Sequence, residues 1–237
     1  MSTAAELVVL SAGAAKGLVE ALAGPFRAET GTGIAGTFGA VGTIREQFLG
    51  AGACDVLILT AAMLDTLAGT GRVVGETIAP LGQVLTGVAV RAGDPHPLIA
   101  DRASLRKCFA DASALYCPDT VKATAGIHFV KVLDALGLWP EVAPRLREHP
   151  SGAIAMRALA EDRAPGLVGC TQVTEILYTP NVELVGVLPE EFRLATTYSI
   201  AVASRSARPA LARRFAKLLA SPQQADLRQR GGFVTAG

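Results

Sequence analysis

The fold is decided by residues 33–60, which read GIAGTFGAVGTIREQFLGAGACDVLILT. Two apolar segments of strand length, 33–39 and 55–60, enclose a segment whose apolar residues share one helical face: Ile44, Phe48 and Leu49. The second strand is apolar without alternation, which is typical of a parallel strand covered on both faces. This order of strand, helix and strand predicts a right-handed crossover between parallel strands.

The same pattern extends in both directions. Before it lie a strand at 6–12 and a helical pattern at 14–31. After it, strands are expected at 83–93, 114–119, 166–171, 182–189 and 196–204, with helices at 103–112, 124–137, 151–162, 208–221 and 221–232. Ser151 is the expected N-cap of its helix.

This series predicts an α/β protein with two lobes, each a doubly wound sheet. Residues 1–82 and 195–237 are expected to form lobe 1, and residues 83–194 lobe 2. The chain would cross between them near Pro80–Val84 and Glu190–Ala195. Two crossings predict a hinge, and a hinge predicts a ligand cleft.

Composition excludes several classes of protein. Among 237 residues, 50% are hydrophobic and 18% charged, which is typical of a globular chain, and a net charge of +1 gives no basic surface for nucleic acid. No apolar run approaches membrane-spanning length, so we expect no membrane insertion. The first residues lack a signal-peptide pattern, which favours a cytoplasmic protein, or a periplasmic one if a signal was trimmed.

Cysteine and histidine spacing gives no sign of a metal or a cofactor. The four cysteines form no CxxC pattern and are expected to be small buried apolar residues. The three histidines lack metal-ligand spacing, and no nucleotide-binding motif is present. We therefore expect no metal and no cofactor.

Small residues mark the points where strands run into helices. The segments are SAGAAKG at 11–17, GAVGT at 39–43, KATAGIH at 122–128 and HPSGAIA at 149–155. Small side chains let a ligand approach the backbone, and a helix start presents free N–H groups and partial positive charge. Four such starts predict a cage for a small anion, although the same residues also suit tight packing.

These segments carry a resemblance to a known family. The chain resembles periplasmic molybdate-binding proteins and the type II periplasmic-binding-protein group around them, through residues 9–22, 37–61, 124–137 and 221–233. The resemblance implies a small anionic ligand and, if the protein is exported, an ABC permease as partner. It further places the chain in a divergent branch similar to aconitate isomerase, which moves a double bond without a cofactor.

The family's ligand contacts fall on changed residues here. Two serine hydroxyls of the family fall at Ala14 and Val41, a backbone N–H at Ala125, another near Pro150, and a tyrosine at Gln172. Each donor lost to a buried dianion costs about 1–3 kcal/mol, so molybdate is expected to bind poorly and a carboxylate to suit the site better.

The expected ligand contacts lie at strand ends and helix starts, and they are Ser11, Gly13, Ala14, Val41, Gly42, Thr43, Tyr116, Ala125, Gly126, Thr171 and Gln172. Lys16 and Arg45 are further candidates for pairing with a carboxylate, or else lie on solvated helix faces. Glu175, Tyr116 and Cys117 are candidates for proton transfer if the protein is an enzyme. The alternative for Glu175 is pairing with a nearby Lys or Arg.

Two main functions remain open. The first is a binding module for an oxyanion or a carboxylate, acting as a receptor or sensor. The second is a cofactor-free isomerase of an unsaturated polycarboxylate, with His128 as base because the positive end of a helix favours a neutral imidazole. A ligand-sensing domain of a transcription regulator is a third reading, but this chain carries no DNA-binding segment.

Overall fold

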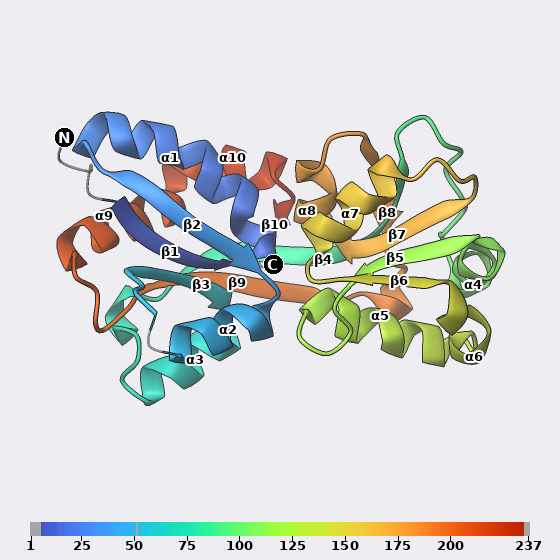
Figure 1. Ribbon diagram of the computed structural model, residues 1–237, viewed down its shortest axis with the longest axis horizontal. Helices are drawn as coiled ribbons and strands as arrows, with labels where there is room; N and C mark the ends of the chain where they lie inside the picture. The colour runs from blue at the N-terminus through green and yellow to red at the C-terminus, as the bar shows by residue number, and fades with distance from the viewer. Residues whose placement is uncertain (1–5, 51, 235–237) are drawn as a thin grey trace. The chain divides into compact units, whose positions relative to one another are not determined.

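The computed structural model describes residues 6–50 and 52–234, and the chain divides into two compact units (Figure 1). Unit 1 contains the residues up to Gln83 and from Thr196 onward, and unit 2 is Val84–Ala195. The hydrogen-bonded strand order is β2-β1-β3-β9-β4-β7-β5-β6, with β8 and β10 also paired to β4. This path is unbroken because β4 (Ala79–Arg91) begins in unit 1 and ends in unit 2.

Unit 1 is built on three parallel strands. β1 (Glu6–Ala12) lies between β2 (Gly33–Gly39) and β3 (Val56–Thr60), and β9 (Ala195–Val202) runs antiparallel to β3. Parallel strands need crossovers, and helices α1 (Lys16–Thr30) and α2 (Val41–Leu49) provide them. A 3-10 turn, Gly13–Ala15, precedes α1.

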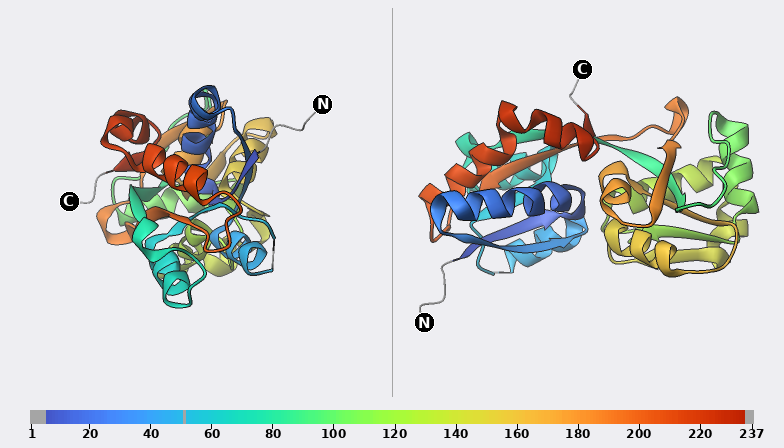
Figure 2. Two further views of the ribbon diagram at one scale, coloured as in Figure 1. Left: turned by 90° about the vertical axis from the view of Figure 1, so that its left-hand side faces the viewer. Right: turned by 90° about the horizontal axis from the view of Figure 1, so that it is seen from above.

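Helices cover both faces of the unit 1 sheet. α1 lies beside α9 (Pro209–Ala220) and α10 (Ala225–Arg230) on one face, while α2 and α3 (Ala61–Gly69) lie on the other (Figures 1 and 2). The rings of Phe26 and Phe215 pack edge to face, with 4.9 Å between their centroids, and join α1 to α9. The short strand β10 (Phe233–Val234) follows α10.

Unit 2 repeats the design. β5 (Ala114–Pro118) lies between β6 (Leu146–His149) and β7 (Leu167–Gln172), all parallel, while β4 runs antiparallel to β7 and to β8 (Val182–Val187). Helices fill the connections, namely α4 (Arg102–Asp111), α5 (Thr124–Ala135), α6 (Trp139–Val142), α7 (Gly152–Glu161) and α8 (Val173–Tyr178).

Two apolar clusters form the core of unit 2, one on each face of its sheet. α4 and α5 pack on one face, where the rings of Phe109 and Phe129 meet edge to face with 5.2 Å between their centroids. α7 and α8 cover the other face through Met156, Leu159 and Ile176. This two-faced packing leaves every residue of β5 and β7 buried.

The structure confirms the expected α/β class and most of the predicted elements. Ser151 is the N-cap of α7, since its Oγ accepts from the Ile154 N–H at 3.4 Å. The four cysteines are buried and free, and burial raises the pKa of the Cys54, Cys108 and Cys117 thiols to about 12.

Several local features differ from the sequence prediction. The elements α3, α6, α8, β6 and β10 were not anticipated, and the helix expected at 221–232 is a 3-10 turn, Pro222–Gln224, followed by α10. β6 reads LREH and has a single strongly apolar residue, because it is an edge strand that pairs with β5 alone among the described strands.

We predict that Gly126→Ala destabilises the protein by about 1–3 kcal/mol or more. A Cβ at Gly126 would lie 2.2 Å from the Asp119 carbonyl oxygen and 2.5 Å from that of Pro118, so the start of α5 would have to move away from β5. Gly24→Ala, also inside a helix, is the control, because its Cβ would meet nothing within 4 Å. Alanine favours the helix by about 0.5–1 kcal/mol over glycine there. Urea unfolding at equilibrium measures both, and equal stabilities would contradict the prediction.

Candidate functional site

The carboxyl edge of the unit 1 sheet gathers three helix starts. β1, β2 and β3 are parallel, so the 3-10 turn before α1 and the first turns of α2 and α3 follow the same edge. Within the described residues, no side chain caps the turns that begin after Ala12, Ala40 and Thr60. The N-cap side chains therefore do not occupy the first-turn N–H groups, as an anion site requires.

The expected contacts of unit 1 offer main-chain groups more than side chains. Ser11 is fully buried, and its hydroxyl donates to the Ala12 carbonyl at 2.9 Å. Gly13 and Ala14 lie in the buried 3-10 turn, while Val41, Gly42 and Thr43 form the first turn of α2. Any ligand of this edge would be held by N–H groups.

The two basic candidates of unit 1 differ. Lys16 lies in the first turn of α1, with its Nζ 3.7 Å from Glu20 and 5.8 Å from the centre of the Phe38 ring. Its charge is thus engaged within its own unit. Arg45 lies half-buried in α2.

The carboxyl edge of the unit 2 sheet has the same geometry. β5, β6 and β7 are parallel and lead into α5, α7 and α8. Before α5, the Asp119 carboxylate accepts from the N–H groups of Val121 and Lys122 at 2.8 and 2.7 Å. No side chain of the described chain caps α5 itself, which leaves the first-turn N–H groups near Ala125 and Gly126 without a side-chain acceptor.

The start of α7 is occupied from within, which corrects the expectation of four open helix starts. The Glu175 carboxylate accepts from the Ala153 N–H at 3.3 Å and from the Thr171 hydroxyl at 2.7 Å. A Cβ at Gly152 would lie 1.9 Å from Glu175 Oε2, so only glycine leaves room for this carboxylate. Glu175 therefore binds neutral donors instead of the expected Lys or Arg.

Burial governs the charge of Glu175. Desolvation raises the pKa of this carboxyl above its ordinary value, and hydrogen bonds from the Thr171 hydroxyl and from main-chain N–H groups oppose that rise. Thr171 was an expected ligand contact, but its hydroxyl hydrogen is committed to Glu175. Sequence reasoning missed this pair, although the i, i+4 spacing of Thr171 and Glu175 and the glycine after Ser151 were visible signals.

Gln172 has the strongest signature of a ligand contact. It ends β7, its residue is 3% exposed, and neither side-chain polar atom has a hydrogen-bond partner among the described residues. Thr86 lies directly opposite it in β4, and its buried Oγ1 likewise has no partner there. Opposed residues have Cβ atoms about 4.5–5.5 Å apart. Unpaired buried polar groups are costly, so this pair is suited to a bound polar group.

Tyr116 does not face this edge, contrary to expectation. Its hydroxyl donates to Asp162 at 2.5 Å, and Asp162 follows the last residue of α7, which runs back toward the opposite edge of the sheet. Burial, and then the hydrogen bond to Asp162, raises the pKa of Tyr116 to about 12. The Tyr116 ring stacks on the His149 ring, with 5.8 Å between the two centroids.

His128, the candidate base, is also engaged. It lies in the second turn of α5, and its Nε2 is 2.8 Å from the Phe192 carbonyl oxygen. Because a carbonyl only accepts, Nε2 carries the hydrogen and Nδ1 is the nitrogen that can take up a proton.

Residues 6–50 and 52–234 contain no group of three or more His, Cys, Asp and Glu side chains placed to hold a metal ion. None of their helices combines the length and the apolar character that crossing a membrane requires.

Two α/β units, each with helix starts along the carboxyl edge of its parallel strands, define the class of type II periplasmic binding proteins. Bacterial extracellular solute-binding proteins, as a family, match residues 7–234. The chain belongs to this family and resembles its ModA-like group.

Two relatives and one solved structure define the neighbourhood. An aconitate isomerase from Pseudomonas sp is 27% identical over 183 residues, which are 76% of this chain and 66% of the isomerase, just under two thirds of its length. The molybdate-binding protein ModA of Escherichia coli is 23% identical over 233 residues, covering 97% of this chain and 89% of ModA. The periplasmic molybdate-binding protein of Azotobacter vinelandii superposes with a TM-score of 0.79 at 18% identity, over 98% of this chain and all of that one.

We predict that Glu175→Gln alters how stability depends on pH. The folded-state pKa of Glu175 is raised, so the folded protein binds its proton more tightly than the unfolded chain does. The contribution of Glu175 to the free energy of unfolding therefore decreases as pH rises above the ordinary pKa of this group, 4.5. Relative to the parent, the variant should gain stability with rising pH. Urea unfolding over a pH series measures this, with Glu161→Gln, an exposed helix residue, as control. A parent–variant difference that is constant across the series would refute it.

Proposed function

We propose that this solute-binding protein binds a small carboxylate, and that molybdate is a poor ligand. The observation that carries the proposal is the buried Gln172 side chain, whose amide nitrogen and oxygen both lack partners in the described chain. A bound group that accepts from Nε2 and donates to Oε1 would satisfy both atoms. A carboxylate beside a hydroxyl or a protonated carboxyl meets this demand.

Main-chain donors complete the proposed contacts. In unit 2 they come from the start of α5, at Ala125 and Gly126. Unit 1 by itself offers donors of the same kind at Gly13, Ala14, Val41, Gly42 and Thr43. Ser11 offers no free hydroxyl hydrogen to a ligand, because its hydroxyl donates to the Ala12 carbonyl oxygen. Ala14 and Val41 carry no hydroxyl, which weakens the case for a tetrahedral oxyanion. Both named relatives act on anions, ModA on molybdate and the isomerase on aconitate, which supports an anionic ligand.

The first test is calorimetry with citrate, cis-aconitate, trans-aconitate and molybdate. We expect a tricarboxylate to bind, and we expect the Kd of molybdate to lie above the micromolar range. Gln172→Ala should raise the Kd of the tricarboxylate by about 10- to 100-fold, since a buried amide loses its ligand. Gln229→Ala, on the exposed side of α10, is the matched control and should leave the Kd unchanged.

Thermal unfolding without ligand separates binding from packing. Removal of an unpaired amide should leave the Tm of the free protein unchanged or higher, whereas a packing role would lower it. Micromolar molybdate binding, or equal Kd values for the Gln172→Ala variant and the parent, would overturn the proposal.

A second candidate is a cofactor-free isomerase of an unsaturated tricarboxylate, favoured by the 27% identity to aconitate isomerase. Migration of the double bond needs removal of a proton from the carbon beside it and return of a proton to its far end. His128 is the proposed base, acting through Nδ1, because Nε2 donates to Phe192. An importer receptor would also need export and a permease partner, whereas an isomerase needs neither.

We predict that His128→Ala abolishes any conversion of cis- to trans-aconitate while the Kd changes by less than about tenfold. The proton NMR signals of the two isomers measure conversion directly. His96→Ala is the control, because this exposed histidine pairs with Glu183 at 3.0 Å. Full conversion by the His128→Ala variant would show that His128 is not the base. If the parent protein converts neither isomer, the isomerase proposal fails and only the binding function remains.

A further inference from the structure

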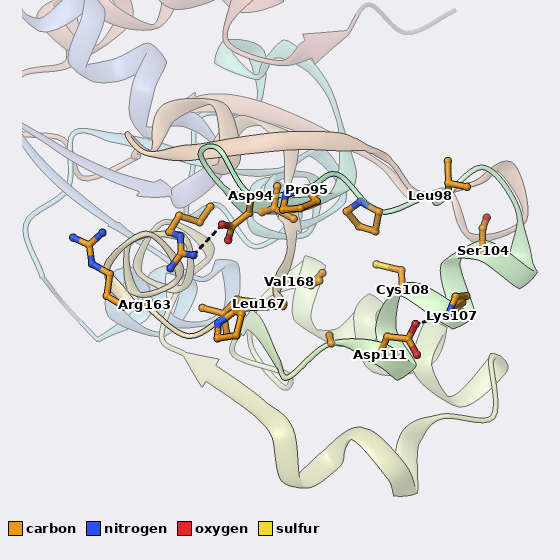
Figure 3. Close-up of a pocket in the computed structure, with 16 residues that line it drawn as sticks. Asp94, Pro95, Leu98, Ser104, Lys107, Cys108, Asp111, Arg163, Leu167 and Val168 are labelled. Carbon is orange, nitrogen blue, oxygen red and sulfur yellow. Dashed lines mark hydrogen bonds and ion pairs between the residues drawn. The ribbon is translucent and has the colours of Figure 1, made fainter.

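Unit 2 has a cavity at the edge of its sheet opposite to Gln172. A cavity of about 650 Å³ lies between the amino end of β7, the end of α4 and the loop that follows β4 (Figure 3). Leu167 and Val168 line it at one end of β7, and Gln172 ends the same strand five residues later. At a rise of about 3.3 Å per residue, roughly 16 Å separate the two places.

Apolar side chains dominate the walls. Pro95, Pro97 and Leu98 come from the loop, and Cys108 and Val168 face them from α4 and β7 (Figure 3). Leu98 is 80% exposed, so a large apolar side chain stands at the rim without cover. The volume falls within the roughly 300–1,000 Å³ of small-molecule sites, and the prolines restrict the loop's backbone.

The charged groups around the cavity neutralise one another. Arg91 pairs with Asp94 at 2.9 Å and Lys107 with Asp111 at 2.6 Å. Arg163 has no ion pair among the described residues, and Figure 3 shows its guanidinium at the far end of the cavity, directed away from Leu98 and Cys108. A charged ligand would lose hydration without gaining a free counter-ion in the centre.

One polar atom of the wall is unsatisfied. Asp94 Oδ1 accepts from Arg91, but the buried Oδ2 has no hydrogen-bond partner in the described chain. Asp94 lines the cavity, and its side chain as a whole is 24% exposed. A donor brought there would pair a carboxylate oxygen, which makes the stronger, charge-assisted type of hydrogen bond.

We propose that this cavity is a second ligand site, which takes a compact, uncharged, apolar molecule with one hydrogen-bond donor. The apolar walls bind the ring or chain of the ligand, and Asp94 accepts from its hydroxyl or N–H. This site is independent of the carboxylate proposed for the Gln172 edge.

The probes are p-cresol, which is uncharged at neutral pH, and its methyl ether, which has the same ring but no donor. We expect saturable shifts of the NMR amide signals near Val168 and Ala112, and an affinity for p-cresol about fivefold higher than for the ether. Asp94→Asn, which keeps the side chain's shape, should bring the two affinities together. Leu98→Ala should weaken both probes, and its exposed position leaves the fold intact.

Gln172→Ala is the control for the other site and should leave both probes unaffected. Equal affinities of the parent for the phenol and the ether would overturn the role of Asp94. Shifts that do not saturate, or that disappear in Gln172→Ala, would overturn the second site itself.

Discussion

A carboxylate removed from water must be surrounded by hydrogen-bond donors, and the side chain of Glu175 imposes this requirement on unit 2. Its donors come from two elements, the Thr171 hydroxyl on β7 and the Ala153 N–H on α7, while Glu175 itself lies in α8. The absence of a side chain at Gly152 leaves the space for this junction. Because these elements meet at one point, the end of β7 is fixed, and Gln172 is held where its strand stops.

The same junction changes the electrostatics of the candidate site. A helix start is attractive to anions only while its N–H groups are free, and Glu175 fills that role at α7. Among the described residues, no side chain caps the start of α5. In the proposed binding mode, recognition at this edge depends on main-chain donors of α5 and on the neutral amide of Gln172. The amide of Gln172 donates through its nitrogen and accepts through its oxygen, whereas the main-chain N–H groups of a helix start only donate.

The two edges of the unit 2 sheet have opposite chemistry for a structural reason. In parallel strands, helices begin after every carboxyl end, so donors collect at that edge. The amino edge receives the ends of helices and the loops, and here those loops supply Pro95, Pro97 and Leu98. One sheet thus presents a polar surface suited to anions and an apolar cavity suited to neutral molecules, separated by the length of β7.

The sequence by itself determined the order of most strands and helices, because apolar periodicity and short glycine-rich turns act over a few neighbouring residues. It also located the small residues at the helix starts, the N-cap Ser151 and the burial of the cysteines. Tertiary structure decided which polar side chains are free to bind. The position of Gln172 opposite Thr86 depends on the register between β4 and β7, and the two residues lie more than eighty residues apart in the chain. Tyr116 and Thr171 were plausible contacts until packing brought Asp162 and Glu175 to their hydroxyls. A hydrogen-bond partner that comes from a distant element leaves no periodic signal near either residue, so only the folded chain could reveal it.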